Sequence, residues 1–266
     1  MSKNWKIKTT DKSIVQSLAE NLGVGKIVAQ LLVLRGITTF DDAKKFFRPE
    51  FSHLHDPYLM KNMQEAVRRI ENAIANKEKI LIYGDYDVDG TTSVAMMYIF
   101  LQKYNQNINY YIPSRHKEGY GISIQGIDHA SENNYSLIIA LDCGIRAVEQ
   151  IDYANEKGID FIICDHHTPA EKTPNAIAVL NPKQVDCNYP FKDLSGCGVG
   201  FKLIQAYCEK NQIPFNEITP LLDLLVVSIA ADIVPMVDEN RLFSFYGLKQ
   251  INENPRVGIK ALMNIT

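Results

Sequence analysis

The central part of the chain alternates between short apolar runs and longer segments with helical spacing. Five short, mostly apolar runs predict strands at residues 79–83, 108–112, 136–142, 160–164 and 176–180. Apolar residues that recur every three or four positions predict intervening helices at residues 63–76, 91–104, 123–133 and 146–157. Strands that alternate with helices of this length predict an α/β fold with a doubly wound, mostly parallel sheet.

Helical spacing also dominates both ends of the chain. At the N-terminus it predicts helices at residues 12–22 and 26–35 and a short helix capped by Thr39 over residues 42–47. At the C-terminus it predicts helices at residues 199–211, 219–231 and 241–251. We therefore expect a small helical segment at residues 1–55, an α/β domain at 56–250 and the start of a connecting helix at 251–266.

Acidic residues and histidines follow three of the predicted strands. They are Asp85, Asp87 and Asp89 after the first strand, Asp142 at the end of the third, and Asp165, His166 and His167 after the fourth. Ligands bind beside the carboxyl ends of the strands in doubly wound sheets. Carboxylates gathered at such an edge repel one another and lose solvation unless cations neutralise them. The pattern therefore predicts a metal site at this edge.

An alternative reading of the first acidic run is a calcium loop. Asp85, Asp87, Asp89 and Gly90 match the opening of an EF-hand loop. The twelfth loop position is Met96, where that loop needs a bidentate glutamate, and the run follows a strand, where it needs a helix. We therefore favour a metal site at the edge of the sheet.

The side chains at this edge indicate which metal they would bind. Carboxylate oxygens and one or two imidazoles, without a thiolate, suit Mn²⁺ or Mg²⁺ better than structural zinc, and the imidazole favours Mn²⁺. So many carboxylates predict two ions that share a bridging aspartate. Two such ions stabilise the attacking and leaving oxygens of a displacement at phosphorus, and one of them lowers the pKa of a water molecule.

Composition limits the class of protein. The 266 residues carry a net charge of −3, which excludes a strongly basic nucleic-acid platform but leaves room for a local basic groove. No apolar run approaches the roughly 20 residues that span a membrane, and the N-terminus lacks the apolar core of a signal peptide. We expect a cytoplasmic location, no membrane partner, and five cysteines that are buried apolar residues without zinc-finger spacing.

Three further segments hold candidate functional residues. The glycine-rich run from Ser195 to Lys202 starts near a predicted helix, where backbone N–H groups bind phosphate, although it is also typical of a simple turn. Arg115 lies in a loop that follows a strand and either binds phosphate or is solvated. Asp232 precedes Pro235 at a helix end, where by itself it would cap the helix or lie on the surface.

Taken together, these motifs resemble the DHH phosphoesterase superfamily, most closely its exonucleases specific for single-stranded DNA. The resembling blocks span nearly the whole chain and are Tyr83–Gly90, Leu141–Gly144, Asp165–Pro169, Ser195–Lys202 and Ala231–Pro235. Residues 34–49 are similar to the segment that precedes the catalytic domain in these exonucleases. The resemblance implies two-metal hydrolysis of single-stranded DNA from the 5′ end, with release of mononucleotides, in DNA repair and recombination.

The resemblance also implies a role for each candidate residue. The implied metal ligands are Asp87, Asp89, Asp142, His166 and Asp232, with Asp142 as the bridge and as a catalytic residue. Asp85 is implied to be catalytic in the place of a histidine of the small-molecule branches, and His167 faces the scissile phosphate. Arg115 is expected to contact the 5′-phosphate. The implied contacts to the DNA backbone are Ser195, Gly196, Gly198, Gly200 and Lys202.

Relatives of this kind carry a second, DHHA1-like domain after the first, so the chain is either a piece of a longer, monomeric protein or a short relative. Two other functions stay open. One is a phosphoesterase for pyrophosphate, cyclic dinucleotides or short oligonucleotides, which Tyr83 disfavours because the small-molecule branches carry a histidine there. The other is a non-catalytic replication scaffold, which the intact set of ligands disfavours.

Overall fold

The computed structural model describes residue 6 and residues 8–265. These residues form two compact units, and the boundary lies between residues 54 and 55. The first unit contains α1 (Lys12–Leu22), α2 (Lys26–Val33), α3 (Phe40–Phe47) and the 3₁₀ turn η1 (Phe51–His53). The Asp11 carboxylate caps α1, and Gly23 ends that helix at a φ of 65°. Thr39 caps α3 as predicted. Leu18, Leu32 and Ala43 belong to a small buried core.

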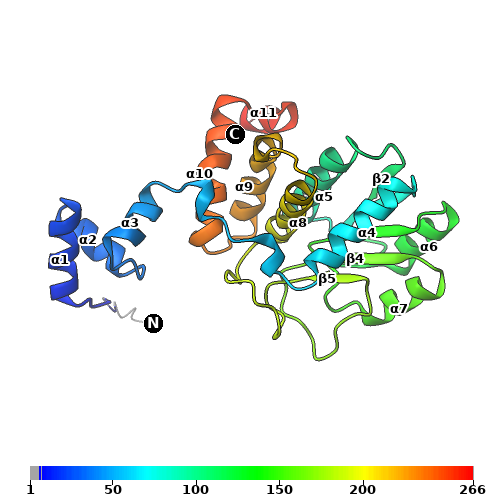
Figure 1. Ribbon diagram of the computed structural model, residues 1–266, viewed down its shortest axis with the longest axis horizontal. Coiled ribbons are helices and arrows are strands. Elements are labelled where there is room, and N and C mark those ends of the chain that lie inside the picture. The colour runs from blue at the N-terminus through cyan, green and yellow to red at the C-terminus, as the bar shows by residue number, and fades with distance from the viewer. Residues whose placement is uncertain (1–5, 7, 266) are drawn as a thin grey trace. The chain divides into compact units, whose positions relative to one another are not determined.

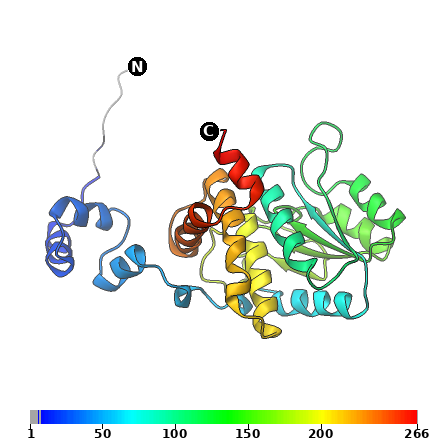
Figure 2. The ribbon, with the colours of Figure 1, turned by 90° about the horizontal axis from the view of Figure 1, so that it is seen from above.

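The second unit is built on a sheet of five parallel strands in the order β2-β1-β3-β4-β5 (Figures 1 and 2). The strands are β1 (Ile80–Gly84), β2 (Ile108–Tyr111), β3 (Leu137–Leu141), β4 (Asp160–Cys164) and β5 (Ala178–Leu180). The predicted α/β fold with a parallel sheet and a helical N-terminal segment is confirmed. Strand order reverses between β1 and β3, and this is the position where ligands bind in such sheets.

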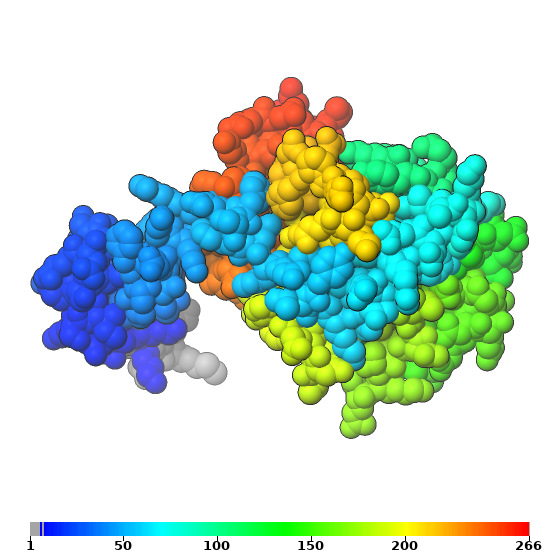
Figure 3. Space-filling view, in the orientation of Figure 1, coloured from blue at the N-terminus to red at the C-terminus, as the bar shows by residue number. Residues whose placement is uncertain are grey.

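Helices cover both faces of the sheet. They are α4 (Met63–Ala75), α5 (Val88–Leu101), α6 (Ile124–Glu132), α7 (Val148–Glu156), α8 (Gly196–Lys210), α9 (Leu222–Ala231), α10 (Asp238–Glu253) and α11 (Val257–Met263). The short turns η2 (Pro57–Leu59), η3 (Phe215–Glu217) and η4 (Thr219–Leu221) join them. On one face α4 and α8 lie side by side, as Figure 3 shows, and α5 packs against both α8 and α9.

The strands β1, β3, β4 and β5 are apolar because both of their faces are buried, whereas β2 at the edge of the sheet is partly exposed. Neighbouring side chains in a strand point to opposite faces, so Leu81, Ile138 and Phe161 pack with α6 and α7 while their neighbours pack on the other side. Every residue of β1 and β3 is buried. Across the described residues, no helix is both long and apolar enough to cross a membrane.

Two of the helices that begin earlier than predicted start at the predicted metal site. α5 begins at Val88 and α8 at Gly196, three residues before the predicted positions 91 and 199. Asp89 and Gly196 therefore lie in the first turns of two helices and not in loops. Because these two helix starts meet at the carboxyl edge of the sheet, the difference changes how the site is built.

Candidate metal centre

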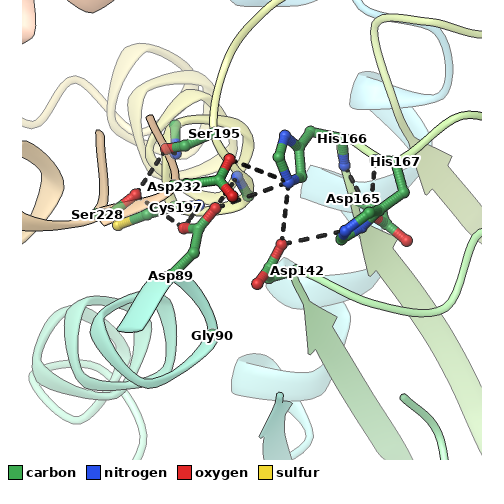
Figure 4. A network of polar contacts seen from close by, with 12 residues as sticks. Asp89, Gly90, Asp142, Asp165, His166, His167, Ser195, Cys197, Ser228 and Asp232 are labelled. Carbon is green, nitrogen blue, oxygen red and sulfur yellow. Dashed lines mark hydrogen bonds and ion pairs between the residues drawn. The ribbon is translucent and has the colours of Figure 1, made fainter. Parts of the chain in front are cut away.

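The predicted ligands from distant parts of the chain meet at one edge of the sheet (Figure 4). Asp142 follows β3, His166 follows β4, Asp89 lies in the first turn of α5, and Asp232 ends α9. The structure therefore brings together four of the five predicted metal ligands around a common point. The fifth, Asp87, caps α5 beside them and accepts a hydrogen bond from the Gly90 backbone.

Asp89 is held at the N-terminus of a second helix. Its two carboxylate oxygens accept hydrogen bonds from the backbone N–H groups of Gly196 and Cys197, at 2.7 and 2.8 Å, and from the hydroxyl of Ser228 at 2.8 Å. Free N–H groups at a helix start stabilise an anion. Burial nevertheless raises the pKa of Asp89, so its ionised form needs further positive charge.

His166 occupies the middle of the group. Its Nε2 atom lies 3.2 Å from Asp142 Oδ1, 3.6 Å from Asp232 Oδ2 and 3.8 Å from Asp89 Oδ2. Among the residues that the structure describes, neither His166 Nε2 nor Asp142 Oδ1 has a hydrogen-bond partner, although both atoms are buried. Buried polar atoms left without a partner are costly unless a ligand satisfies them.

The donor set fits a divalent cation. Asp142, His166 and His167 form one group whose ligand atoms lie within 4.8 Å of one another, and Asp89, His166 and Asp232 form a second. Burial, with the nearby charges of Asp89 and Asp87, raises the pKa of Asp142 to about 10. A cation would offset the cost of ionising this buried carboxylate. Carboxylate oxygens with an imidazole suit Mn²⁺ or Mg²⁺.

The backbone is strained next to two of the ligands. Asp142 has a φ of 59° and Ile233, directly after Asp232, has a φ of 56°. A left-handed conformation is tolerable for an aspartate but is costly for a β-branched isoleucine. Such strain persists where the surrounding structure imposes it, and it is frequent at functional sites.

A second histidine is oriented by Asp165, a residue of the predicted acidic pattern for which no separate role was predicted. The Asp165 carboxylate accepts hydrogen bonds from the backbone N–H groups of His166, His167 and Ile145 and lies 2.7 Å from His167 Nδ1. This contact raises the pKa of His167. The Tyr120 hydroxyl lies 3.1 Å from the other ring nitrogen, Nε2. In the sequence, the position of Asp165 directly after β4 and next to the predicted ligands was the feature that could have indicated this role.

Asp85 lies beside the group without joining it. The side chain is completely buried, and one oxygen accepts a hydrogen bond from the Tyr86 backbone. Its other oxygen, Oδ2, has no hydrogen-bond partner within the described chain. Burial raises the pKa of Asp85, and the charge of Asp87 adds to the shift. The structure thus leaves Asp85 with one oxygen available at the edge of the centre.

The predicted phosphate contacts of the glycine-rich segment are contradicted. The Gly196 N–H donates to Asp89, and the Gly198 N–H donates to Ser195 Oγ, which also contacts Ser228. Gly200 packs against Leu141 inside the helix, where an added Cβ would lie 3.0 Å from that side chain. The segment is buried, so its amides hold a protein carboxylate and are not free for DNA.

Lys202 is also placed differently from the prediction. Its ammonium group is fully buried and donates hydrogen bonds to Glu239 Oε1 at 3.0 Å and to the His55 carbonyl at 2.7 Å. Glu239 also accepts a hydrogen bond from the Tyr189 hydroxyl. A lysine committed to this buried pair does not reach a phosphate at the centre, so its predicted contact is wrong.

Arg115 lies on an exposed loop near the centre. Its guanidinium carbon is 5.4 Å from the centroid of the Tyr86 ring, which contacts the Tyr120 ring at 6.2 Å. These aromatic contacts connect the loop to His167 through Tyr120. Beside them is a cavity of about 420 Å³, and its lining includes Tyr120, Arg146, Gln150 and His167.

The geometry agrees with comparisons to known proteins. The family model for the DHH family, N-terminal domain, matches residues 79–229. A single-stranded-DNA-specific exonuclease RecJ from Bacillus subtilis is 44% identical over 262 residues, which is 98% of this chain but 33% of that protein. The chain therefore spans about a third of the length of this relative.

Two solved structures share the fold. A crystal structure of exonuclease RecJ bound to manganese has a TM-score of 0.72 and 29% identity. The match covers 81% of this chain and 54% of the chain in that structure. A crystal structure of RecJ from Thermus thermophilus in complex with Mn²⁺ has a TM-score of 0.81 and 25% identity. The match covers 97% of this chain and 36% of the chain in that structure. By its sequence match, this chain belongs to the DHH family.

Proposed function

We propose that the chain is the catalytic part of a metal-dependent exonuclease that hydrolyses single-stranded DNA from the 5′ end and releases mononucleotides. The observation that carries the proposal is the buried pair His166 Nε2 and Asp142 Oδ1, which lie 3.2 Å apart without hydrogen-bond partners in the described chain. The RecJ relatives, which are exonucleases specific for single-stranded DNA, support the choice of substrate.

Two Mn²⁺ or Mg²⁺ ions are the proposed cofactors. Asp89, Asp142, His166 and Asp232 would hold them, with Asp87 beside these residues. Asp142 is the proposed shared ligand, because its Oδ1 is buried without a hydrogen-bond partner in the described chain. When bound, such ions polarise the phosphoryl oxygens and lower the pKa of a water molecule. Asp89 is oriented for this role by α8, and Asp142 by its left-handed backbone.

His167 is the proposed contact to the scissile phosphate. Asp165 accepts a hydrogen bond from Nδ1, which keeps a proton on that atom and turns Nε2 away from Asp165. The same contact raises the pKa of His167, and a protonated ring can donate from Nε2 to a phosphate oxygen. The Tyr120 hydroxyl would hold the ring in this orientation before substrate binds.

The rest of the substrate would lie along the surface next to His167. Arg115, exposed and stacked on Tyr86, is the proposed contact to the 5′-phosphate, and the cavity beside Tyr120 would hold the adjoining nucleoside. We also propose a cytoplasmic, monomeric protein in which a second, DHHA1-like domain follows this chain. Single-stranded DNA as the substrate supports that location.

The experiment is digestion of a 3′-labelled single-stranded oligonucleotide in the presence of Mn²⁺, with Asp142→Ala run in parallel. The proposal predicts a ladder that shortens from the 5′ end and is missing with the variant. Hydrolysis of pyrophosphate or a cyclic dinucleotide without cleavage of DNA would favour the small-molecule phosphoesterase. Equal cleavage by Asp142→Ala would contradict the proposed centre.

A further inference from the structure

The two units of the chain carry opposite charge. Residues 1–54 contain nine lysines and arginines against five aspartates and glutamates, a net charge of +4. The remaining residues contain nineteen against twenty-six, a net charge of −7, with carboxylates concentrated at the metal centre. A polyanion such as DNA is attracted by the first unit and repelled by much of the second.

One helix of the basic unit carries exposed aromatic rings between its cations. Phe40, Lys44 and Phe47 follow one another at intervals of four and three residues, so they share one face of α3, and Arg48 follows directly. The two phenylalanines are 51% and 50% exposed. Ala43, in contrast, is completely buried in the core of the unit. We name Phe40, Lys44, Phe47 and Arg48 the α3 aromatic face.

The charges on this face are available to a ligand. Lys44 and Arg48 form no ion pair within the described part of the chain. The nearby carboxylate of Asp42 is engaged in a hydrogen bond with the Thr39 hydroxyl at the start of the helix. The Phe47 ring is supported at its edge by Phe46, at a centroid distance of 5.2 Å, which holds it in place for stacking.

We propose that the α3 aromatic face binds single-stranded nucleic acid, with bases stacked on Phe40 and Phe47 and phosphates paired with Lys44 and Arg48. Aromatic rings interleaved with cations are the means by which proteins bind single strands without sequence preference. The two rings are separated by about 10 Å along the helix axis, enough for each to receive a different base. A purely apolar protein partner would leave the two cations without counter-charges.

This inference adds a second contact for the same substrate and rests on the proposed function, so its test is a binding measurement that requires no cleavage. The full chain is titrated into a fluorescent single-stranded oligothymidylate in EDTA, and anisotropy is recorded for wild type, Phe40→Ala/Phe47→Ala and Phe40→Tyr/Phe47→Tyr. The alanine variant is expected to lose at least about tenfold in affinity, and the tyrosine variant to keep it because a tyrosine ring also stacks.

Two controls separate this face from general effects of charge and apolar surface. Ile27→Ala/Leu31→Ala removes exposed apolar groups of the same unit from a different helix, and Lys8→Gln/Lys12→Gln removes two exposed cations outside α3. Both are expected to weaken binding less than Phe40→Ala/Phe47→Ala. Equal affinity of the alanine variant and wild type, or equal losses in the controls, would overturn the proposal and leave the face for a protein partner. Because EDTA prevents turnover, the result does not depend on whether the chain cleaves DNA.

Discussion

The Gly196 backbone N–H donates a 2.7 Å hydrogen bond to Asp89 Oδ2, and it does so across 107 positions of the sequence. The glycine is required because its Cα faces a second acidic residue. A Cβ at position 196 would lie 2.6 Å from both Cβ and Oδ1 of Asp142. One small residue therefore holds the first carboxylate and makes room for the second.

Gly196→Ala should therefore damage the metal centre without removing a ligand. The added methyl group has to displace Asp142 or the start of α8, and we expect Mn²⁺ affinity to fall by at least about tenfold, as when groups that orient ligands are lost. Isothermal titration with Mn²⁺ measures this change. Gly198→Ala is the matched control, because its Cβ would approach no closer than 3.3 Å to Leu194. Equal Mn²⁺ affinity of Gly196→Ala and wild type would show that the close packing is unimportant.

Asp165→Asn tests the orientation of His167. An amide has the size of the carboxylate, but its NH₂ group is a donor. In the variant this group would face one of the N–H groups that now donate to Asp165, so that hydrogen bond would be lost. We expect kcat for a model phosphodiester to fall by about 10- to 100-fold, with a smaller change in KM. Tyr120→Phe, which removes only the contact to Nε2, should have a weaker effect in the same direction. An unchanged kcat for Asp165→Asn would rule out this positioning role.

Lys202→Met tests whether the buried lysine is structural. Removing one partner of a fully buried ion pair leaves Glu239 without its counter-charge, which is expected to lower the free energy of unfolding by about 3–5 kcal/mol. Urea denaturation measures the loss, and Lys202→Met/Glu239→Gln should recover part of it because the uncompensated charge is removed. Mn²⁺ affinity should stay that of wild type while the variant is folded. A stable variant with weakened DNA binding would instead restore the predicted phosphate contact.

The pH dependence of stability should reveal a second ion-pair network. Arg69 contacts Glu78 and Asp160 at 2.7 and 2.6 Å. Burial by itself would raise the pKa of Glu78, but the hydrogen bonds from Arg69 and Ser136 outweigh it and lower the pKa. The stabilisation from Glu78 is therefore complete above the pKa that this residue has in the unfolded chain. It is lost as the pH falls through the lower pKa of Glu78 in the folded chain. Glu78→Gln should show a shallower loss of unfolding free energy than wild type below about pH 5, measured by urea denaturation at several pH values.

The sequence predicts the sheet and the ligand-bearing strand ends because both are local properties. A strand covered on two faces is apolar along its whole length, and parallel strands bring their carboxyl ends to one edge, so Asp142 and His166 could be expected near one another. The start of α8 at Gly196 was harder to predict, because glycines favour a turn. Ser195 caps this helix locally, but the hydrogen bonds from its first N–H groups to Asp89 depend on the tertiary fold.

The errors arise where function depends on tertiary pairing. A lysine that follows a glycine-rich run is indistinguishable in sequence from a phosphate ligand, and its partner Glu239 lies 37 positions away on another helix. The role of Asp165 was hidden for the opposite reason. Asp165 is next to the predicted ligands in the sequence. Only the hydrogen bonds of the folded chain distinguish a residue that orients histidines from one that would bind metal.

The most direct test of the metal centre is isothermal titration of the metal-free chain with Mn²⁺, performed on wild type and on Asp142→Asn. The substitution keeps the shape of the side chain but removes the charge that burial and neighbouring carboxylates make costly. Saturable binding of Mn²⁺ by wild type, lost or strongly weakened in the variant, is the predicted result. No binding by wild type, or equal binding by Asp142→Asn, would contradict a metal centre built on Asp142.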